Sequence, residues 1–128
     1  MASHSPPDRP KVLVVEDEFI IALDLSETVK DLGYELEGPF EGNQAAIDAM
    51  QDESLPDCAI LDVFTADGEV YPLADRLSAA GVPIVFHSGH VTPDEVRARY
   101  PEAQACAKPC PPDRLIGALQ EAAGKVHA

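Results

Sequence analysis

Hydrophobic and polar residues alternate along this chain in blocks whose spacing predicts strands and helices in turn. Val12 to Val15 is an unbroken apolar run rich in β-branched side chains, typical of a strand that is covered on both faces. Apolar residues then recur at helical spacing from Ile21 to Leu32, and Gly33 ends that segment. The pattern therefore predicts a buried strand followed directly by a helix.

The same alternation continues to the C-terminus. Further strands are predicted at 34–40, 58–61, 82–86 and 103–107, and further helices at 43–51, 71–80 and 113–123. Thr92 to Glu95 has the pattern of a helix N-terminus, and Pro101 keeps that helix short. Alternating strands and helices imply right-handed crossovers and a parallel sheet with helices on both faces. We therefore expect an α/β fold built on a doubly wound sheet.

The length and the charge of the chain limit what it can be. A chain of 128 residues fits one domain, which we place at 11–124, after a disordered lead-in at 1–10 and before a short tail at 125–128. A net charge of −14 argues against binding to nucleic acid or to anionic membranes. No apolar run reaches the roughly 18 residues of a membrane span, and the start does not read as a signal peptide. We therefore expect a cytoplasmic protein.

The three cysteines are an odd number and predict no disulfide framework. Cys58 and Cys106 fall in apolar, strand-like runs, where a thiol acts as a small hydrophobic side chain. The C-x3-C spacing of Cys106 and Cys110 lacks the partners of a metal or redox site. We expect structural thiols.

Charged and polar side chains follow four of the predicted strands, at the end where each strand finishes. These residues are Glu16 and Asp17, then Asp62, Ser88 and Lys108. Open parallel sheets bind their ligands at the carboxyl ends of the strands, so the side chains are expected to share one pocket. Clustered carboxylates repel one another unless a cation offsets them, and Mg²⁺ suits oxygen ligands of this kind.

Each of these residues also has a plain structural explanation. Acids such as Glu16 and Asp17 are favoured before a helix by the helix dipole, and Asp62 fits the start of a turn. Ser88 fits a strand exit, and Lys108 fits a solvated loop. The functional interpretation rests on the register, because four separate strands end in matching chemistry.

With these strand ends in place, the chain resembles the receiver domains of two-component response regulators. The motifs that carry the resemblance are VLVVEDE, AILDV, VFHSG and AKP, within a match from Lys11 to Ala123. The stretch PIVFHSGHV, Pro83 to Val91, is similar to the fourth-strand signature of the single-domain FAT GUY receivers. The resemblance implies a flavodoxin-like (βα)5 fold with a parallel sheet of strand order 2-1-3-4-5.

The resemblance also implies a role for the acids of the pocket. Asp62 matches the phosphoacceptor, a carboxylate that attacks a phosphoryl group in line. Asp17 and Asp62 would ligate Mg²⁺ directly, and Glu16 would do so through water. The backbone carbonyl of Phe64 would be a further ligand. Such a protein catalyses only its own phosphorylation and dephosphorylation, so we do not class it as an enzyme.

Two further residues match the part of a receiver that responds to the phosphoryl group. Lys108 would pair with a phosphoryl oxygen, and the peptide bond to Pro109 would be cis, as in the family. Ser88 would turn its hydroxyl toward the phosphate and move the loop after its strand. A phosphoryl group adds about −1.5 to −2 charge, which can shift a small two-state element.

The chain departs from the receiver pattern at positions that usually report phosphorylation. Ala105 stands where the family carries an aromatic residue, Val91 replaces the FAT GUY tyrosine, and Cys110 stands where Phe is common. The usual coupling of a hydroxyl to an aromatic side chain is therefore not expected. His87 and His90 invite a metal interpretation, but strand alternation directs His87 away from its neighbour.

The leading interpretation is a single-domain response regulator, monomeric or weakly dimeric, phosphorylated by a histidine kinase or a histidine phosphotransfer protein. The alternatives are a pseudo-receiver that binds partners without phosphorylation, and a receiver excised from a hybrid histidine kinase, although Met1 favours a natural start. A haloacid-dehalogenase phosphatase needs a second Asp where Phe64 stands. A flavodoxin-like electron carrier needs a polar phosphate loop where EDEF stands.

Overall fold

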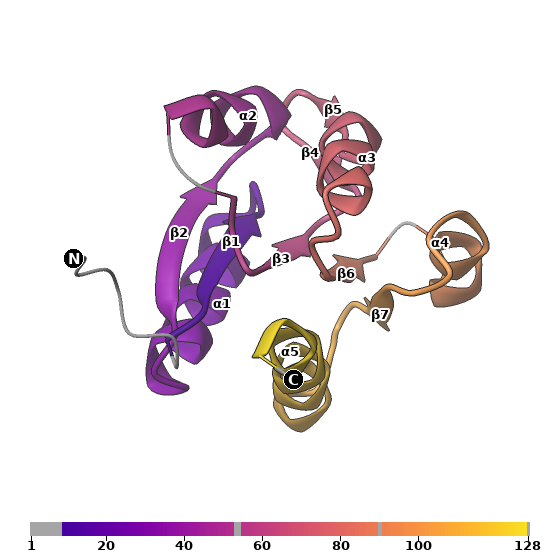
Figure 1. Cartoon of the computed structure of the whole chain (residues 1–128). Coiled ribbons are helices and arrows are strands. Elements are labelled where there is room, and N and C mark those ends of the chain that lie inside the picture. Colours follow the sequence, from indigo (N-terminus) through magenta and orange to yellow (C-terminus); the bar gives the residue numbers. More distant parts are fainter. Residues whose placement is uncertain (1–8, 53–54, 90, 128) are drawn as a thin grey trace.

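The computed structural model describes residues 9–52, 55–89 and 91–127, and a five-stranded parallel sheet forms its centre (Figure 1). The strands, in spatial order, are β2 (Glu35–Phe40), β1 (Lys11–Val15), β3 (Cys58–Leu61), β6 (Ile84–Ser88) and β7 (Gln104–Ala107). Counted along the chain without the two short strands β4 and β5, this is the order 2-1-3-4-5. The predicted fold class is confirmed.

Helices cover both faces of the sheet, as Figure 1 shows. One face carries α1 (Phe19–Asp31) and α5 (Pro112–His127), and the other carries α2 (Asn43–Asp52), α3 (Tyr71–Ala79) and α4 (Pro93–Arg99). The two faces hold separate apolar clusters. In β1, Val12 and Val14 face one cluster while Leu13 and Val15 face the other. Unbroken apolar runs arise because both sides of such strands are buried.

The segment between β3 and α3 contains two short strands that the sequence pattern does not predict. Two strands of two residues each, β4 (Phe64–Thr65) and β5 (Gly68–Glu69), pair antiparallel there. Asp67 lies at the tip, and its carboxylate accepts the backbone N–H groups of Asn43 and Gln44 at 2.7 and 3.0 Å. The hairpin therefore caps the N-terminus of α2. Strands this short carry no alternation that a sequence pattern could reveal.

Element ends differ by a few residues from those predicted. β6 continues to Ser88, because Ser88 still pairs with Ala107 of β7. α5 continues to His127, four residues past its predicted end. The short α4 has the expected capping box, in which the Glu95 N–H donates to Thr92 Oγ1 at 3.1 Å and the Thr92 N–H donates to Glu95 Oε1 at 2.8 Å. Residues 1–8 of the predicted lead-in, and His90, lie outside the described residues.

Candidate functional site

Lys108 lies at the centre of a cluster of acids at the carboxyl edge of the sheet. Its Nζ is 3.0 Å from Glu16 Oε1, 3.1 Å from Asp62 Oδ2 and 3.2 Å from Glu18 Oε1. The side chains of Glu16 and Asp62 are 0% and 4% exposed, and that of Lys108 is 14% exposed. Buried charges of one sign need a compensating partner, and the ammonium supplies it.

Backbone hydrogen bonds between neighbouring strands position these side chains. The Asp62 N–H donates to the carbonyl of Val15 at 3.0 Å, which ties the end of β3 to β1. The Lys108 N–H donates to the carbonyl of Ser88 at 2.9 Å, which ties the end of β7 to β6. Because the strands are parallel and in register, the residues that follow them meet at one edge.

Three carboxylates form a set that can hold a metal ion. One oxygen each of Glu16, Asp17 and Asp62 lie within 4.8 Å of one another. Asp17 is exposed, whereas the other two are buried. Asp62 Oδ1 is buried and accepts no hydrogen bond from the part of the chain that the structure describes. An unpaired carboxylate oxygen among hard oxygen donors is what Mg²⁺ coordination requires, so this set fits the predicted cation.

The electrostatics of the pocket favour a bound proton or cation. Burial raises the pKa of Glu16 to about 7, although hydrogen bonds from Lys108 and from the Glu18 N–H oppose the rise. Burial also opposes the charge on Lys108, but its hydrogen bond to Glu16 and the charge of Asp62 outweigh burial and raise its pKa. The ammonium of Lys108 therefore stays charged at neutral pH. Glu16 is the group that can lose its proton to solvent when a cation binds.

The other residues of the predicted site lie at the same edge. Ser88 is the last residue of β6 and is buried, and its carbonyl accepts the Lys108 N–H. Phe64 begins β4 two residues after Asp62, with a half-exposed side chain. The Lys108–Pro109 peptide bond is cis, as predicted.

Aromatic residues from other elements belong to the apolar cluster that contains Ala105. Ala105 pairs with Phe86 across β6 and β7 and is buried. The ring of Tyr100, at the end of α4, packs 5.2 Å from the ring of Phe86. Tyr100 Oη donates to Asp75 Oδ1 at 2.6 Å, and its ring stacks 6.2 Å from that of Tyr71. Tyr100, at the end of α4, is therefore tied both to Phe86 of β6 and to α3.

Sequence reasoning missed two features of the site. Glu18, the third acid of the EDE run, contacts Lys108. Its position directly after Glu16 and Asp17 is the sequence feature that could have identified it. The expectation of structural thiols is wrong for Cys106 and Cys110, which form a disulfide with Cα atoms 5.9 Å apart. Cys58 is a free, buried thiol, and burial and the charge of Asp57 raise its pKa to about 12.

His87 precedes Ser88 in β6 and lies close enough to the acidic pocket for the charges of Lys108, Asp62 and Glu18 to act on it. It is 7% exposed, and with Lys108 and Leu115 it lines a groove between α1 and α5. Burial, and then the charge of Lys108, lower the pKa of His87. The residues that could ligate a metal in the described chain are the three acids of the pocket, and His87 is not among them.

The strand order and the helices on both faces are those of a receiver fold, and comparisons with known proteins agree. No family model matches the sequence. The chain is 31% identical over 118 residues to the transcriptional regulatory protein PdtaR of Mycobacterium tuberculosis, covering 90% of this chain and 57% of that protein. The chain spans about half the length of the curated relatives it matches.

Solved structures match over nearly the whole chain. The signal receiver domain of a modulated diguanylate cyclase from Desulfovibrio desulfuricans G20 matches with a TM-score of 0.78 and 29% identity, covering 94% of this chain and 98% of that one. SdrG from Sphingomonas melonis Fr1 matches with a TM-score of 0.72 and 31% identity, covering 88% and 94%. The chain belongs to the response regulator receiver domains. Within the described residues, no helix is long and apolar enough to cross a membrane.

Proposed function

We propose that this chain is a single-domain response regulator that accepts a phosphoryl group on Asp62 from a histidine kinase or a histidine phosphotransfer protein. The observation that carries the proposal is the contact of Lys108 Nζ with Asp62 Oδ2 at 3.1 Å, beside the further acids Glu16 and Asp17. Phosphoryl transfer depends chiefly on positioning and on neutralisation of charge. A buried carboxylate with a neighbouring ammonium and a cation site provides both.

The transfer exchanges one bond for another. An oxygen of Asp62 forms a bond to phosphorus while the P–N bond of the donor phosphohistidine breaks and the nitrogen keeps the electron pair. Mg²⁺, when bound, neutralises charge on the phosphoryl oxygens. Glu16, Asp17, Asp62 and the carbonyl of Phe64 would hold the cation, and Lys108 would exchange its contacts with Glu16 and Glu18 for a phosphoryl oxygen.

The response to phosphorylation would begin at Ser88. Its hydroxyl would turn toward the new phosphate and move the loop that follows β6. The PIVFHSGHV stretch supports a place near the FAT GUY subgroup, whose members are single-domain receivers. The protein would act in the cytoplasm, as a monomer or a weak homodimer, through contacts with other proteins and without binding nucleic acid.

An exposed apolar patch next to the pocket supports a protein as the phosphoryl donor. Phe19, Ile20 and Leu23, in the first two turns of α1, are 77%, 66% and 47% exposed. α1 begins directly after the acids of the pocket, so a partner that covers this patch places its own residues at Asp62. Exposed clustered apolar side chains are typical of protein-contact surfaces.

Labelling with acetyl phosphate and Mg²⁺, followed by intact mass measurement, tests the proposal. We expect one added phosphoryl group on the wild type and on Asp48→Asn, a matched exchange at an exposed position of α2, and none on Asp62→Asn. The alternative is a pseudo-receiver that binds partners constitutively, and the lack of an aromatic residue at Ala105 favours it. An unlabelled wild type that still binds Mg²⁺ would support that alternative.

A further inference from the structure

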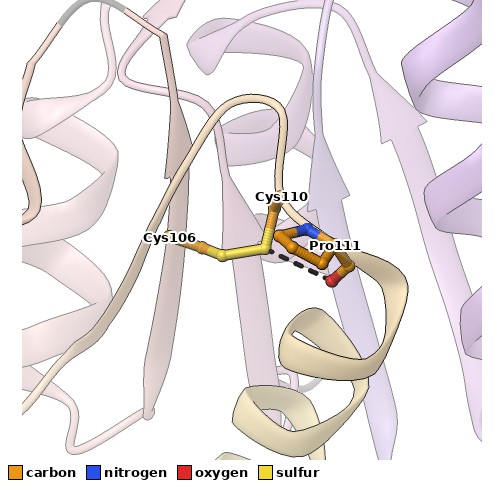
Figure 2. Close-up of a disulfide and its surroundings, with 3 residues drawn as sticks. All are labelled: Cys106, Cys110 and Pro111. Carbon is orange, nitrogen blue, oxygen red and sulfur yellow. Dashed lines mark hydrogen bonds between the residues drawn. A yellow bond between two sulfur atoms is a disulfide. The ribbon is translucent and has the colours of Figure 1, made fainter.

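A disulfide closes the loop that carries Lys108. Cys106, near the end of β7, is bonded to Cys110, which precedes α5, and Figure 2 shows the loop rising between them. The Cα atoms are 5.9 Å apart, well within the range of protein disulfides. Lys108 lies at the middle of this five-residue ring. The disulfide thus links the backbone before Lys108 to the backbone after it. The ammonium of Lys108 contacts Glu16 and Asp62.

The two sulfurs differ in access. Cys106 is 4% exposed, whereas Cys110 is half-buried. Cys110 also lines a groove of about 700 Å³ between α1 and α5, which is large enough to admit a small molecule. Cys110 Sγ lies 3.7 Å from the carbonyl oxygen of Pro111 (Figure 2), where a reduced thiol can donate. The loop therefore has a place for this sulfur in both oxidation states.

We propose that Cys106 and Cys110 form a reversible thiol–disulfide couple, oxidised by an uncharged low-molecular-weight disulfide, that sets how firmly Lys108 is held at the acidic pocket. In a reducing compartment, protein disulfides are mostly transient and redox-sensing rather than structural. The proposed cytoplasmic location therefore favours a regulatory role for this bond. Reactivity follows access to the sulfur, which the groove provides at Cys110.

The oxidation proceeds by two exchanges. The Cys110 thiolate attacks one sulfur of the small disulfide RSSR and expels RS⁻, which leaves a mixed disulfide. The Cys106 thiolate then attacks the Cys110 sulfur and expels the second RS⁻. Two protein thiols lose two protons and two electrons, and RSSR becomes two RSH. Because Glu18, Asp24 and Glu27 also line the groove, an uncharged disulfide enters more readily than anionic glutathione disulfide.

The consequence for the pocket follows from what holds Lys108. In the oxidised protein, the ring restricts the backbone on both sides of the lysine. The N–H bond of Lys108 to Ser88 and its side-chain contacts do not involve the two sulfurs, so reduction should loosen the lysine without releasing it. An ammonium that is already held at the pocket before the phosphoryl group arrives speeds phosphoryl transfer. This expectation rests on the proposed function: Asp62 should be phosphorylated about fivefold faster in the oxidised protein than in the reduced protein.

The redox couple is tested first and without reference to phosphorylation. The protein is equilibrated in mixtures of bis(2-hydroxyethyl) disulfide and 2-mercaptoethanol, free thiols are trapped by alkylation, and intact mass is measured. Wild type and Cys58→Ala should interconvert between forms that differ by two trapped thiols, and Cys110→Ser should not. A bond that is reduced only after unfolding in urea would overturn the proposal. An equal oxidation rate with glutathione disulfide would contradict the class of oxidant.

The link to the pocket is tested on the same samples. The rate of labelling by acetyl phosphate should be about fivefold higher for oxidised than for reduced wild type, and Cys110→Ser should match the reduced rate in either buffer. The amide NMR signals of Glu16 and Asp62 should shift between the two states. If the shifts stay within residues 105–111, the coupling to the pocket is refuted. If neither state is labelled, the proposed function fails, while thiol trapping and NMR still decide the redox couple.

Discussion

The raised pKa of Glu16 makes a direct prediction about stability. In the metal-free folded protein this pKa is about 7, against 4.5 for an ordinary Glu carboxyl. Because the folded state holds the proton more tightly than the unfolded state, the contribution of Glu16 to stability is fully present below pH 4.5. It is lost as the pH rises through 7. At about 1.4 kcal/mol for each tenfold change in proton affinity, the loss is about 3 kcal/mol.

Glu16→Gln removes this titration with little change in size. At pH 5 the side chain of wild-type Glu16 is protonated in the folded protein, so variant and wild type should differ by less than about 1 kcal/mol. At pH 8 in EDTA the variant should be the more stable protein, by up to about 3 kcal/mol, because it buries no carboxylate. Ionisable groups that do not interact with Glu16 contribute equally to both proteins and cancel from the difference.

Urea unfolding followed by circular dichroism measures this difference at both pH values. Asp48→Asn is the matched control, because the side chain of Asp48 is exposed on α2 and should give the same offset at pH 5 and pH 8. The reasoning is refuted if the gap between wild type and Glu16→Gln is equal at the two pH values. That result would mean that Lys108 compensates the charge of Glu16 completely.

Three further predictions concern the pocket, the β4–β5 hairpin and the donor surface. Calorimetry should show Mg²⁺ affinity falling about tenfold from pH 8 to pH 6, since a proton with a pKa near 7 must leave Glu16, and a flat profile would contradict this. Asp67→Ala should lower the unfolding free energy by about 1 kcal/mol, because the cap on α2 is lost. Hydrogen bonds from the N–H groups of α2 lower the pKa of Asp67, so the stabilisation by this cap should be lost as the pH falls below 3.8. With a histidine kinase that phosphorylates the wild type, Ile20→Asp should slow transfer about tenfold but leave acetyl phosphate labelling unchanged, and equal slowing of both would exclude a docking role.

The fold was predictable because its elements carry strong local signals. Val12 to Val15 and Cys58 to Leu61 are fully apolar, which marks strands buried on both faces. Once the strands are parallel, their carboxyl ends meet at one edge. The convergence of Asp62 and Lys108 therefore required no knowledge of distances, only the order of the strands.

The features that were missed depend on geometry that no pattern encodes. The two-residue strands β4 and β5 are too short to show alternation, so the cap that Asp67 gives to α2 was invisible. Cys106 behaves as the buried apolar residue that its surroundings suggested, at 4% exposure. Its bond to Cys110 arises because the chain turns back after β7, and the turn is a property of the assembled loop.

The contacts of Lys108 also indicate where a signal can leave the pocket. The aromatic cluster on the α3–α4 face is held in place, because the hydroxyl of Tyr100 is bonded to Asp75 and Arg99 lies 3.9 Å above the ring of Tyr71. Ala105, being small, offers no side chain that could change rotamer there. Lys108, in contrast, is bonded directly through its backbone to Ser88 and leads into α5. Under the proposed function, a shift of the lysine toward a phosphoryl group would therefore act first on the loop between β7 and α5, which the disulfide closes.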